Sequence, residues 1–349
     1  MARAPKAIDD DKGPPPSPFR MPEARARLFG HEEAMSAVRH RIRDGSFSNG
    51  WLIAGPDGVG KATFAFQTAR ILLGAEEDDA DGRRAASLIA AGAHPDLFVA
   101  RRAWNEKTQK FATEISVDTV RALGSFLSRT AAMGGWRAAI VDSADELNRN
   151  AANALLKVLE EPPARAVLML TTSQPGRLLA TIRSRCRVLT LRPLTDAAVR
   201  SFLEAGEDIA LNEIDRLVDG ARGRPGLGLR LSTNDGAMAL AAVEEFMRAS
   251  DAARQPDAIG RLSARGGEAA YELFVALLGE RLADTVRRNA ADGAPEQLVR
   301  SLVAAYDAAR EQFSRGQGLN LDRAQVAGAV WRILARADIG RMSRAVANR

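Results

Sequence analysis

A glycine-rich turn between an apolar strand and a helix is the feature that most limits how this chain can fold. The turn, Gly55-Pro56-Asp57-Gly58-Val59-Gly60-Lys61, has the glycine and lysine spacing of a phosphate-binding loop. A buried-type strand over 51–54 precedes it, and a helix over 61–73 is predicted to follow. Gly55, Gly58 and Gly60 let backbone N–H groups turn toward a phosphate, and Lys61 reaches the outer phosphates. The pattern predicts an α/β domain of nucleotide-binding ancestry.

Strands and helices alternate along the rest of the first half. Further strands are predicted over 96–100, 137–141, 166–172 and 187–191. Ser116 is expected to cap one intervening helix, and Pro162-Pro163 should terminate another that begins near Asn150. We read 76–81 as an acidic surface loop. Such alternation predicts a parallel sheet covered by helices on both faces.

The pattern changes after Pro193, where strand signals stop. We predict a disordered tail over 1–22, the α/β domain over 23–194, a small helical lid over 195–236 and an all-helical C-terminal domain over 237–349. Two apolar stripes at helical spacing mark the last domain. They are Phe274, Leu277, Leu278 and Leu282, and Val326, Val330, Ile333 and Leu334.

Composition restricts the chemistry and the location of the chain. The sequence holds 49 Lys plus Arg against 44 Asp plus Glu, a mild basic excess that is compatible with nucleic-acid contact but does not demonstrate it. Its one cysteine, Cys186, excludes an internal disulfide and a zinc site made of cysteines. With neither a signal-peptide core nor an apolar run of bilayer length, the chain is expected in the cytoplasm without a membrane partner.

Four segments carry a resemblance to a known family. Asn150–Pro163 closely resembles the helix that follows the Walker B strand in clamp-loader subunits, and Ser184-Arg185-Cys186 resembles their Ser-Arg-Cys motif. Leu28-Phe29-Gly30-His31 and His94-Pro95-Asp96-Leu97 also match. The chain therefore resembles the delta-prime subunits of the bacterial DNA polymerase III clamp loader, which are AAA+ proteins. The likeness is dense from 28 to 193. Afterwards it is one of architecture, apart from Leu319-Asn320-Leu321-Asp322, which resembles a C-terminal clamp-loader segment.

That resemblance implies a place in a hetero-oligomer. Clamp loaders are rings of five AAA+ subunits joined by a collar of C-terminal domains, and they place a sliding clamp on primed DNA. The implied partners are the tau/gamma and delta subunits, the clamp, and DNA through the complex. Many relatives carry a four-cysteine zinc module that this chain lacks between 74 and 93, so zinc is not expected.

Two positions depart from a working ATPase. Ala62 stands where a Ser or Thr hydroxyl would ligate Mg²⁺, and Thr63, one residue late, points elsewhere on the helix. Asp142 is placed to hold the metal, but Ser143 follows it where AAA+ ATPases have a glutamate that orients water. Losing both groups should cost several orders of magnitude in rate. We expect weak ATP binding at best and negligible hydrolysis by this chain.

The Ser-Arg-Cys resemblance implies that Arg185 is an arginine finger acting in trans on a neighbour's ATP, since a guanidinium offers forked donors and keeps its charge. A lone arginine can instead pair with an acid on its own surface.

Thr171-Thr172-Ser173 occupy the sensor 1 location, and Arg224 and Arg230 are both candidates for sensor 2. Two other functions stay open: an ATPase motor subunit of the tau/gamma type, and a nucleotide-dependent DNA-binding module outside replication.

Overall fold

The chain forms two compact units, of which the first ends at Leu227 and the second begins at Gly228. This computed structural model describes residues 17, 19–206 and 209–339. Most of the predicted tail, residues 1–16 and 18, lies outside the described residues. Its last residue, Pro22, begins a short 3-10 turn, η1 (Pro22–Ala24). The finer boundaries expected at 22, 194 and 236 stay predictions.

A five-stranded sheet organises the first unit, and its neighbouring strands are parallel. The strands are β1 (Gly50–Ala54), β2 (Leu97–Ala100), β5 (Arg137–Val141), β6 (Ala166–Thr172) and β7 (Arg187–Thr190). Their spatial order is β2-β5-β6-β1-β7. A separate two-stranded hairpin joins β3 (Trp104–Asn105) to β4 (Lys110–Phe111). The five predicted strands are thus confirmed to within one residue at either end.

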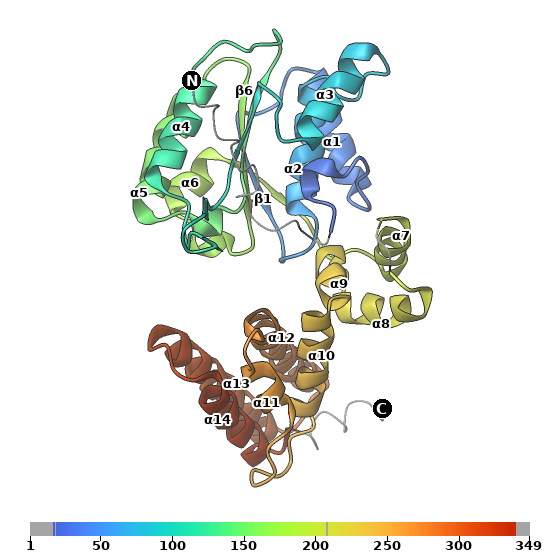
Figure 1. Cartoon of the computed structure of the whole chain (residues 1–349), viewed down its shortest axis with the longest axis vertical. Coiled ribbons are helices and arrows are strands. Elements are labelled where there is room, and N and C mark those ends of the chain that lie inside the picture. Colours follow the sequence, from blue (N-terminus) through green and yellow to red (C-terminus); the bar gives the residue numbers. More distant parts are fainter. Residues whose placement is uncertain (1–16, 18, 207–208, 340–349) are drawn as a thin grey trace, which may run out of the picture. The chain divides into compact units, whose positions relative to one another are not determined.

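Three helices cover each face of this sheet (Figure 1). One face carries α1 (Glu32–Arg43), α2 (Lys61–Leu72) and α3 (Ala80–Ala90), and the other carries α4 (Val117–Leu127), α5 (Arg149–Glu160) and α6 (Ala180–Arg185). Side chains alternate across the strands, so that Trp51 and Ile53 join the core with Phe64, whereas Leu52 joins the core with Leu155. The predicted class, a parallel sheet with a phosphate-binding loop after its first strand and with helices on both faces, is confirmed.

Side-chain caps explain where several helices start. The Ser116 side chain accepts a hydrogen bond from the Thr119 N–H at the start of α4, as predicted. Part of the stretch expected as an acidic loop is instead α3, because Asp79 caps it by accepting from the Gly82 N–H. The sequence analysis also missed α6, whose last two residues are Ser184 and Arg185.

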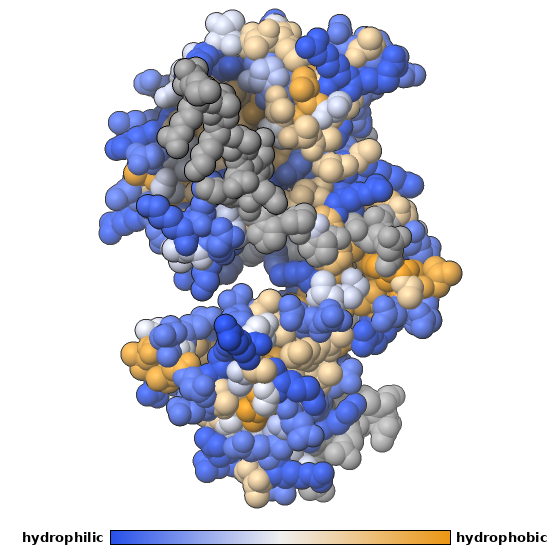
Figure 2. Space-filling view, in the orientation of Figure 1, coloured by the Kyte–Doolittle hydropathy of each residue, from blue (hydrophilic) through white to orange (hydrophobic). Residues whose placement is uncertain are grey.

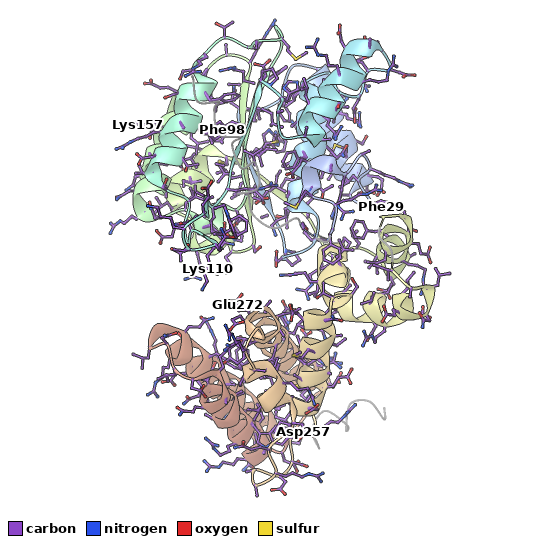
Figure 3. All side chains as sticks on the ribbon, viewed as in Figure 1. Phe29, Phe98, Lys110, Lys157, Asp257 and Glu272 are labelled. Atoms are coloured by element: carbon purple, nitrogen blue, oxygen red, sulfur yellow. The ribbon has the colours of Figure 1, made fainter. Side chains whose placement is uncertain are left out.

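Three lid helices follow the sheet: α7 (Asp196–Gly206), α8 (Leu211–Ala221) and α9 (Pro225–Leu231). Pro225 opens α9, a position where its missing N–H has no helical partner to lose. Phe29 lies beside α7 (Figure 3), with its ring centroid 5.6 Å from that of Phe202. The Gly226 N–H donates to the Gly58 carbonyl at 2.8 Å. The start of α9 is therefore bonded directly to the phosphate-binding loop.

The second unit is helical through residue 339, the last that the structure describes, as predicted. Its helices are α10 (Asn234–Phe246), α11 (Ala258–Ser263), α12 (Glu268–Ala291), α13 (Glu296–Gly318) and α14 (Arg323–Arg336). Both predicted apolar stripes are buried inside this unit except Ile333, which is half-buried. Phe274 anchors the core by ring contacts with Phe246 and Phe313.

The surface in view is mainly hydrophilic, with apolar atoms in limited patches (Figure 2). Among the helices of the described ranges, none combines the length and the apolar character that crossing a membrane requires.

Candidate functional site

The phosphate-binding loop leaves the carboxyl end of β1 with backbone angles that favour glycine. The φ angles of Gly55, Gly58 and Gly60 are 153°, 81° and 106°. A Cβ on Gly55 would lie 2.5 Å from the Leu191 carbonyl oxygen, and one on Gly58 would lie 2.7 Å from the Leu227 nitrogen. The chain around the loop therefore permits only glycine at 55 and 58.

Lys61 is directed at acceptors of its own chain. Its side chain is buried, with 8% of the residue exposed. The ammonium nitrogen donates to the carbonyls of Gly55 and Pro56 at 3.0 Å each and to Ser173 Oγ at 2.9 Å. An ammonium has three N–H donors. These three acceptors match that capacity, and the group expected to bind phosphate is held inside the protein.

Asp142, at the end of β5, is engaged through both carboxylate oxygens. Oδ1 accepts from the Thr171 hydroxyl at 2.9 Å, and Oδ2 accepts from Arg101 Nε at 3.3 Å. The same guanidinium donates to both carboxylate oxygens of Glu23, at 3.0 and 3.1 Å. Burial lowers the pKa of Arg101, but the hydrogen bonds to Glu23 and the charge of Asp142 outweigh it and raise the pKa. A cation of the chain itself therefore neutralises the carboxylate expected to hold a metal.

The acids that follow Asp142 are engaged as well. Asp145 accepts hydrogen bonds from the Thr172 hydroxyl, from the Ser173 N–H at 2.6 Å and from the Ser143 hydroxyl at 3.0 Å. Thr171, Thr172 and Ser173, expected at the sensor 1 location, are thus brought to this edge of the sheet.

Glu146 pairs with Arg102, with 3.1 Å between the carboxylate oxygen and Nε. Burial raises the pKa of Glu146, and the charge of Arg102 opposes that shift. Ala62 supplies no side-chain oxygen, and the Ser143 hydroxyl donates to Asp145. The residues present do not fit a magnesium–ATP site.

Three hydrogen bonds near the phosphate-binding loop and α2 were not predicted from the sequence. His31 Nε2 donates to the Val59 carbonyl at 3.1 Å, so this histidine supports the phosphate-binding loop. The segment before it lies along α2, where Gln67 donates to the Arg25 carbonyl at 2.7 Å and Arg70 donates to the Glu23 carbonyl at 2.9 Å. The partners are 28 or more positions apart in sequence, so no local pattern could reveal them.

Arg185 lies at the opposite edge of the sheet. It is the last residue of α6, and β7 then pairs in parallel with β1, with Arg187 beside Trp51. The start of β1 is therefore next to Arg185, whereas the phosphate-binding loop follows its end. Five strand residues, Gly50 to Ala54, separate the two places. At 3.3 Å per residue this is about 16 Å. The structure does not bring Arg185 to the loop of its own chain.

The guanidinium of Arg185 has two partners on this chain. Nη2 lies 2.8 Å from Glu160 Oε1, and Nη1 donates to the Thr181 carbonyl at 3.2 Å. The side chain is 36% exposed and lines a pocket of about 260 Å³, whose polar members include Ser48, Asn49 and Arg187.

Cys186, the next residue, is buried, and burial raises the pKa of its thiol to about 11. Its side chain packs in the core shared by α5 and α6. Within Ser-Arg-Cys, the cysteine is a packing residue, whereas the serine and the arginine are exposed.

Comparisons with known proteins agree with these motifs. Residues 30–195 match the family model described as DNA polymerase III, delta subunit. The chain is 43% identical over 155 residues to the DNA polymerase III subunit delta' of Pseudomonas aeruginosa, covering 43% of this chain and 45% of that one. It is 29% identical over 244 residues to the subunit tau of Salmonella typhimurium, covering 66% of this chain and 36% of that one.

Among solved structures, the fold is similar to that of a DNA polymerase III gamma subunit-related protein from Thermotoga maritima. The TM-score is 0.47 at 16% identity, over 87% of this chain and 99% of that one. The sequence matches to delta' relatives span about half the length of those proteins.

Proposed function

We propose that the chain is a clamp-loader subunit of the delta-prime type in DNA replication, because residues 30–195 match the family model described as DNA polymerase III, delta subunit. In this role it does not turn over ATP itself, or does so only weakly. It supplies Arg185 to the ATP of a neighbouring subunit and thereby completes an active site that its own chain does not contain.

The observation that carries this proposal is the self-contained hydrogen-bond network around the phosphate-binding loop. To bind magnesium and ATP, Lys61 would have to leave three acceptors, and Asp142 would have to exchange Arg101 for a metal. Each buried polar group left without a partner costs about 1–3 kcal/mol. Ala62 offers no ligand that would offset this cost. ATP binding is therefore weak, and hydrolysis lacks both a metal site and a water-orienting acid.

The position of Arg185 supports action in trans. It stands about 16 Å from the loop of its own chain, because one strand length separates the two edges of a parallel sheet. A guanidinium keeps its charge and presents a planar fork that suits phosphate oxygens. On a face that a neighbouring subunit approaches, such a group stabilises the charge that develops during phosphoryl transfer.

The proposed partners follow from this role. They are the tau/gamma and delta subunits of the clamp loader in a hetero-oligomer, the sliding clamp, and primed DNA through the complex. The helical domain after residue 237 serves as the collar piece. Zinc and membranes have no part in the proposal.

An ATPase motor of the tau/gamma type is the competing assignment, and relatives of that name do match the chain. The ion pair between Arg101 and Asp142, together with Ala62 and Ser143, argues against it. A DNA-binding module outside replication would require tight DNA binding by the isolated chain.

Affinity purification of the tagged full-length chain from its own cells tests the assignment. We expect the other clamp-loader subunits to be recovered with it. The purified chain alone should release no phosphate from ATP above background, with or without primed DNA. Steady-state turnover that Lys61→Ala abolishes would support the motor assignment, and recovery of none of the subunits would rule out the clamp-loader role.

A further inference from the structure

Glu160 contacts Arg185 from an unfavourable position on its own helix. It is the last residue of α5, and the helix dipole places partial negative charge at that end, which disfavours an acidic side chain. Arg185 is the last residue of α6, and α5 packs against α6. Two helix C-termini thus bring one carboxylate and one guanidinium together, 2.8 Å apart.

We propose that Glu160 is a positioning residue for Arg185. This inference rests on the proposed role of Arg185 as a finger in trans. Glu160 holds the guanidinium on one side, so that the remaining donors face the phosphates of the neighbouring subunit when the subunits assemble.

The number of donors makes this arrangement workable. A guanidinium carries five N–H groups in a fixed fork. The contacts with Glu160 and with the Thr181 carbonyl each engage one terminal nitrogen. Three N–H groups remain for a phosphate while both anchors stay in place. Glu160 therefore need not be displaced for Arg185 to act.

The carboxylate acts through the geometry of Arg185 rather than through its charge state, because arginine stays protonated at any working pH. A long side chain loses rotamer freedom when it is fixed. Anchoring on Glu160 and Thr181 removes part of that freedom before a phosphate is met. Both members of the pair are partly exposed, at 36% and 49% of their side chains, so the anchor is weak enough to adjust.

Arg187 provides an internal contrast, since it lines the same pocket. Its guanidinium lies over the Trp51 ring, 5.6 Å from the centroid, rather than against a carboxylate. Arg185 is thus the arginine of this pocket that α5 holds, which is what a positioning role for Glu160 requires.

The test uses the reconstituted clamp loader with only this subunit changed. Glu160→Ala removes both the charge and the acceptor, and Glu160→Gln keeps an acceptor oxygen. Glu161→Ala is the matched control. Glu161 is also exposed at the end of α5, and its substitution removes the same charge.

We expect Glu160→Ala to lower kcat of the Arg185-dependent part of the ATPase roughly two- to fivefold, the range that an exposed ion pair supplies. The KM for ATP should stay the same, because the neighbour's loop binds the ground state. Glu160→Gln should show a smaller loss, and Glu161→Ala should match the unchanged complex.

A double variant separates this role from a structural one. In the Arg185→Ala background, Glu160→Ala should have no further effect. A loss of the same size in both backgrounds would mean that Glu160 supports the fold, and a rise in kcat would mean that it restrains Arg185. Either result overturns the inference, as does an unchanged rate in Glu160→Ala alone. If Arg185→Ala itself changes nothing, the proposed function fails first.

Discussion

The two edges of the five-stranded sheet use their cations in different ways. At the carboxyl edge, Lys61 and Arg101 are held by acceptors of the same chain, and Lys61 is 8% exposed. At the amino edge, Arg185 is 36% exposed and has one carboxylate and one carbonyl as partners. The carboxyl edge is a hydrogen-bond network within the chain, whereas the amino edge leaves one arginine partly accessible. In the function we propose, the fold has lost its own nucleotide chemistry and keeps a contribution to that of a neighbour.

Parallel strands explain why both edges matter to an assembly. Consecutive parallel strands direct all their carboxyl ends to one edge, so the loop after β1 and the residues before β7 are separated by a strand length. An active site that needs both a phosphate-binding loop and Arg185 must therefore be built from two chains. In the arrangement we propose, this subunit provides one of the two halves.

The largest effect should come from the amino edge. Arginine fingers elsewhere contribute about 10³-fold or more in rate. We expect Arg185→Ala to abolish the contribution of the one dependent site, to lower the total ATPase of the reconstituted complex in part, and to impair clamp loading more severely. Arg185→Lys should rescue poorly, because a point charge does not reproduce the fork.

Arg187→Ala is the control for this variant, because Arg187 is an exposed arginine of the same pocket. It should leave ATPase and loading close to those of the unchanged complex. Equal losses for the two variants would point to a general loss of positive charge. If Arg185→Ala leaves both ATPase and clamp loading unchanged, Arg185 has only its structural pairing with Glu160. The two edges of the sheet would then not differ in function.

A smaller effect, and one of a different kind, is expected at the carboxyl edge. In a working ATPase, loss of the loop lysine removes activity. Here Lys61→Ala should leave the ATPase of the complex unchanged and lower the free energy of unfolding by about 2–3 kcal/mol, because three acceptors lose their donor. Urea denaturation of the isolated chain measures the loss, and Lys157→Ala, exposed on α5 (Figure 3), should change it by less than about 0.5 kcal/mol. If the Lys61→Ala chain is as stable as the unchanged chain but its complex has lost ATPase activity, the carboxyl edge still takes part in ATP turnover.

Motifs and periodicity predicted much of this contrast. The spacing of Gly55 to Lys61, the substitutions at Ala62 and Ser143, and the strand that leads to Asp142 are local, so the sequence alone indicated a degenerate site. The sequence also indicated Arg185, through the Ser-Arg-Cys resemblance. The helix that carries it, α6, was missed because six residues are too few to show a helical period.

The partners that close the carboxyl edge could not be found in the same way. Arg101 reaches Glu23 across 78 positions and Asp142 across 41, and His31 reaches Val59 across 28. From its local sequence alone, each of these side chains would be predicted to be an ordinary surface or capping residue. Tertiary packing alone assigns them to the site.

The smallest effect tests whether Arg101 is part of the network or a surface charge. Arg101→Gln removes the cation between Glu23 and Asp142, and we expect a loss of about 1 kcal/mol in the free energy of unfolding, because both carboxylates keep some contact with water. Arg102→Gln breaks the pair with Glu146, which is more exposed to solvent, and should therefore lower the free energy of unfolding by less. The sharper readout is amide hydrogen exchange at Ala24 in η1 and at Arg25, which caps it. Exchange should become faster in Arg101→Gln and stay the same in Arg102→Gln. Added magnesium and ATP should not slow it again, since Ala62 still offers no ligand for a metal at the released Asp142. Protection of η1 by magnesium and ATP in Arg101→Gln would show that this guanidinium alone keeps nucleotide out, and the carboxyl edge would then be a blocked site rather than a lost one.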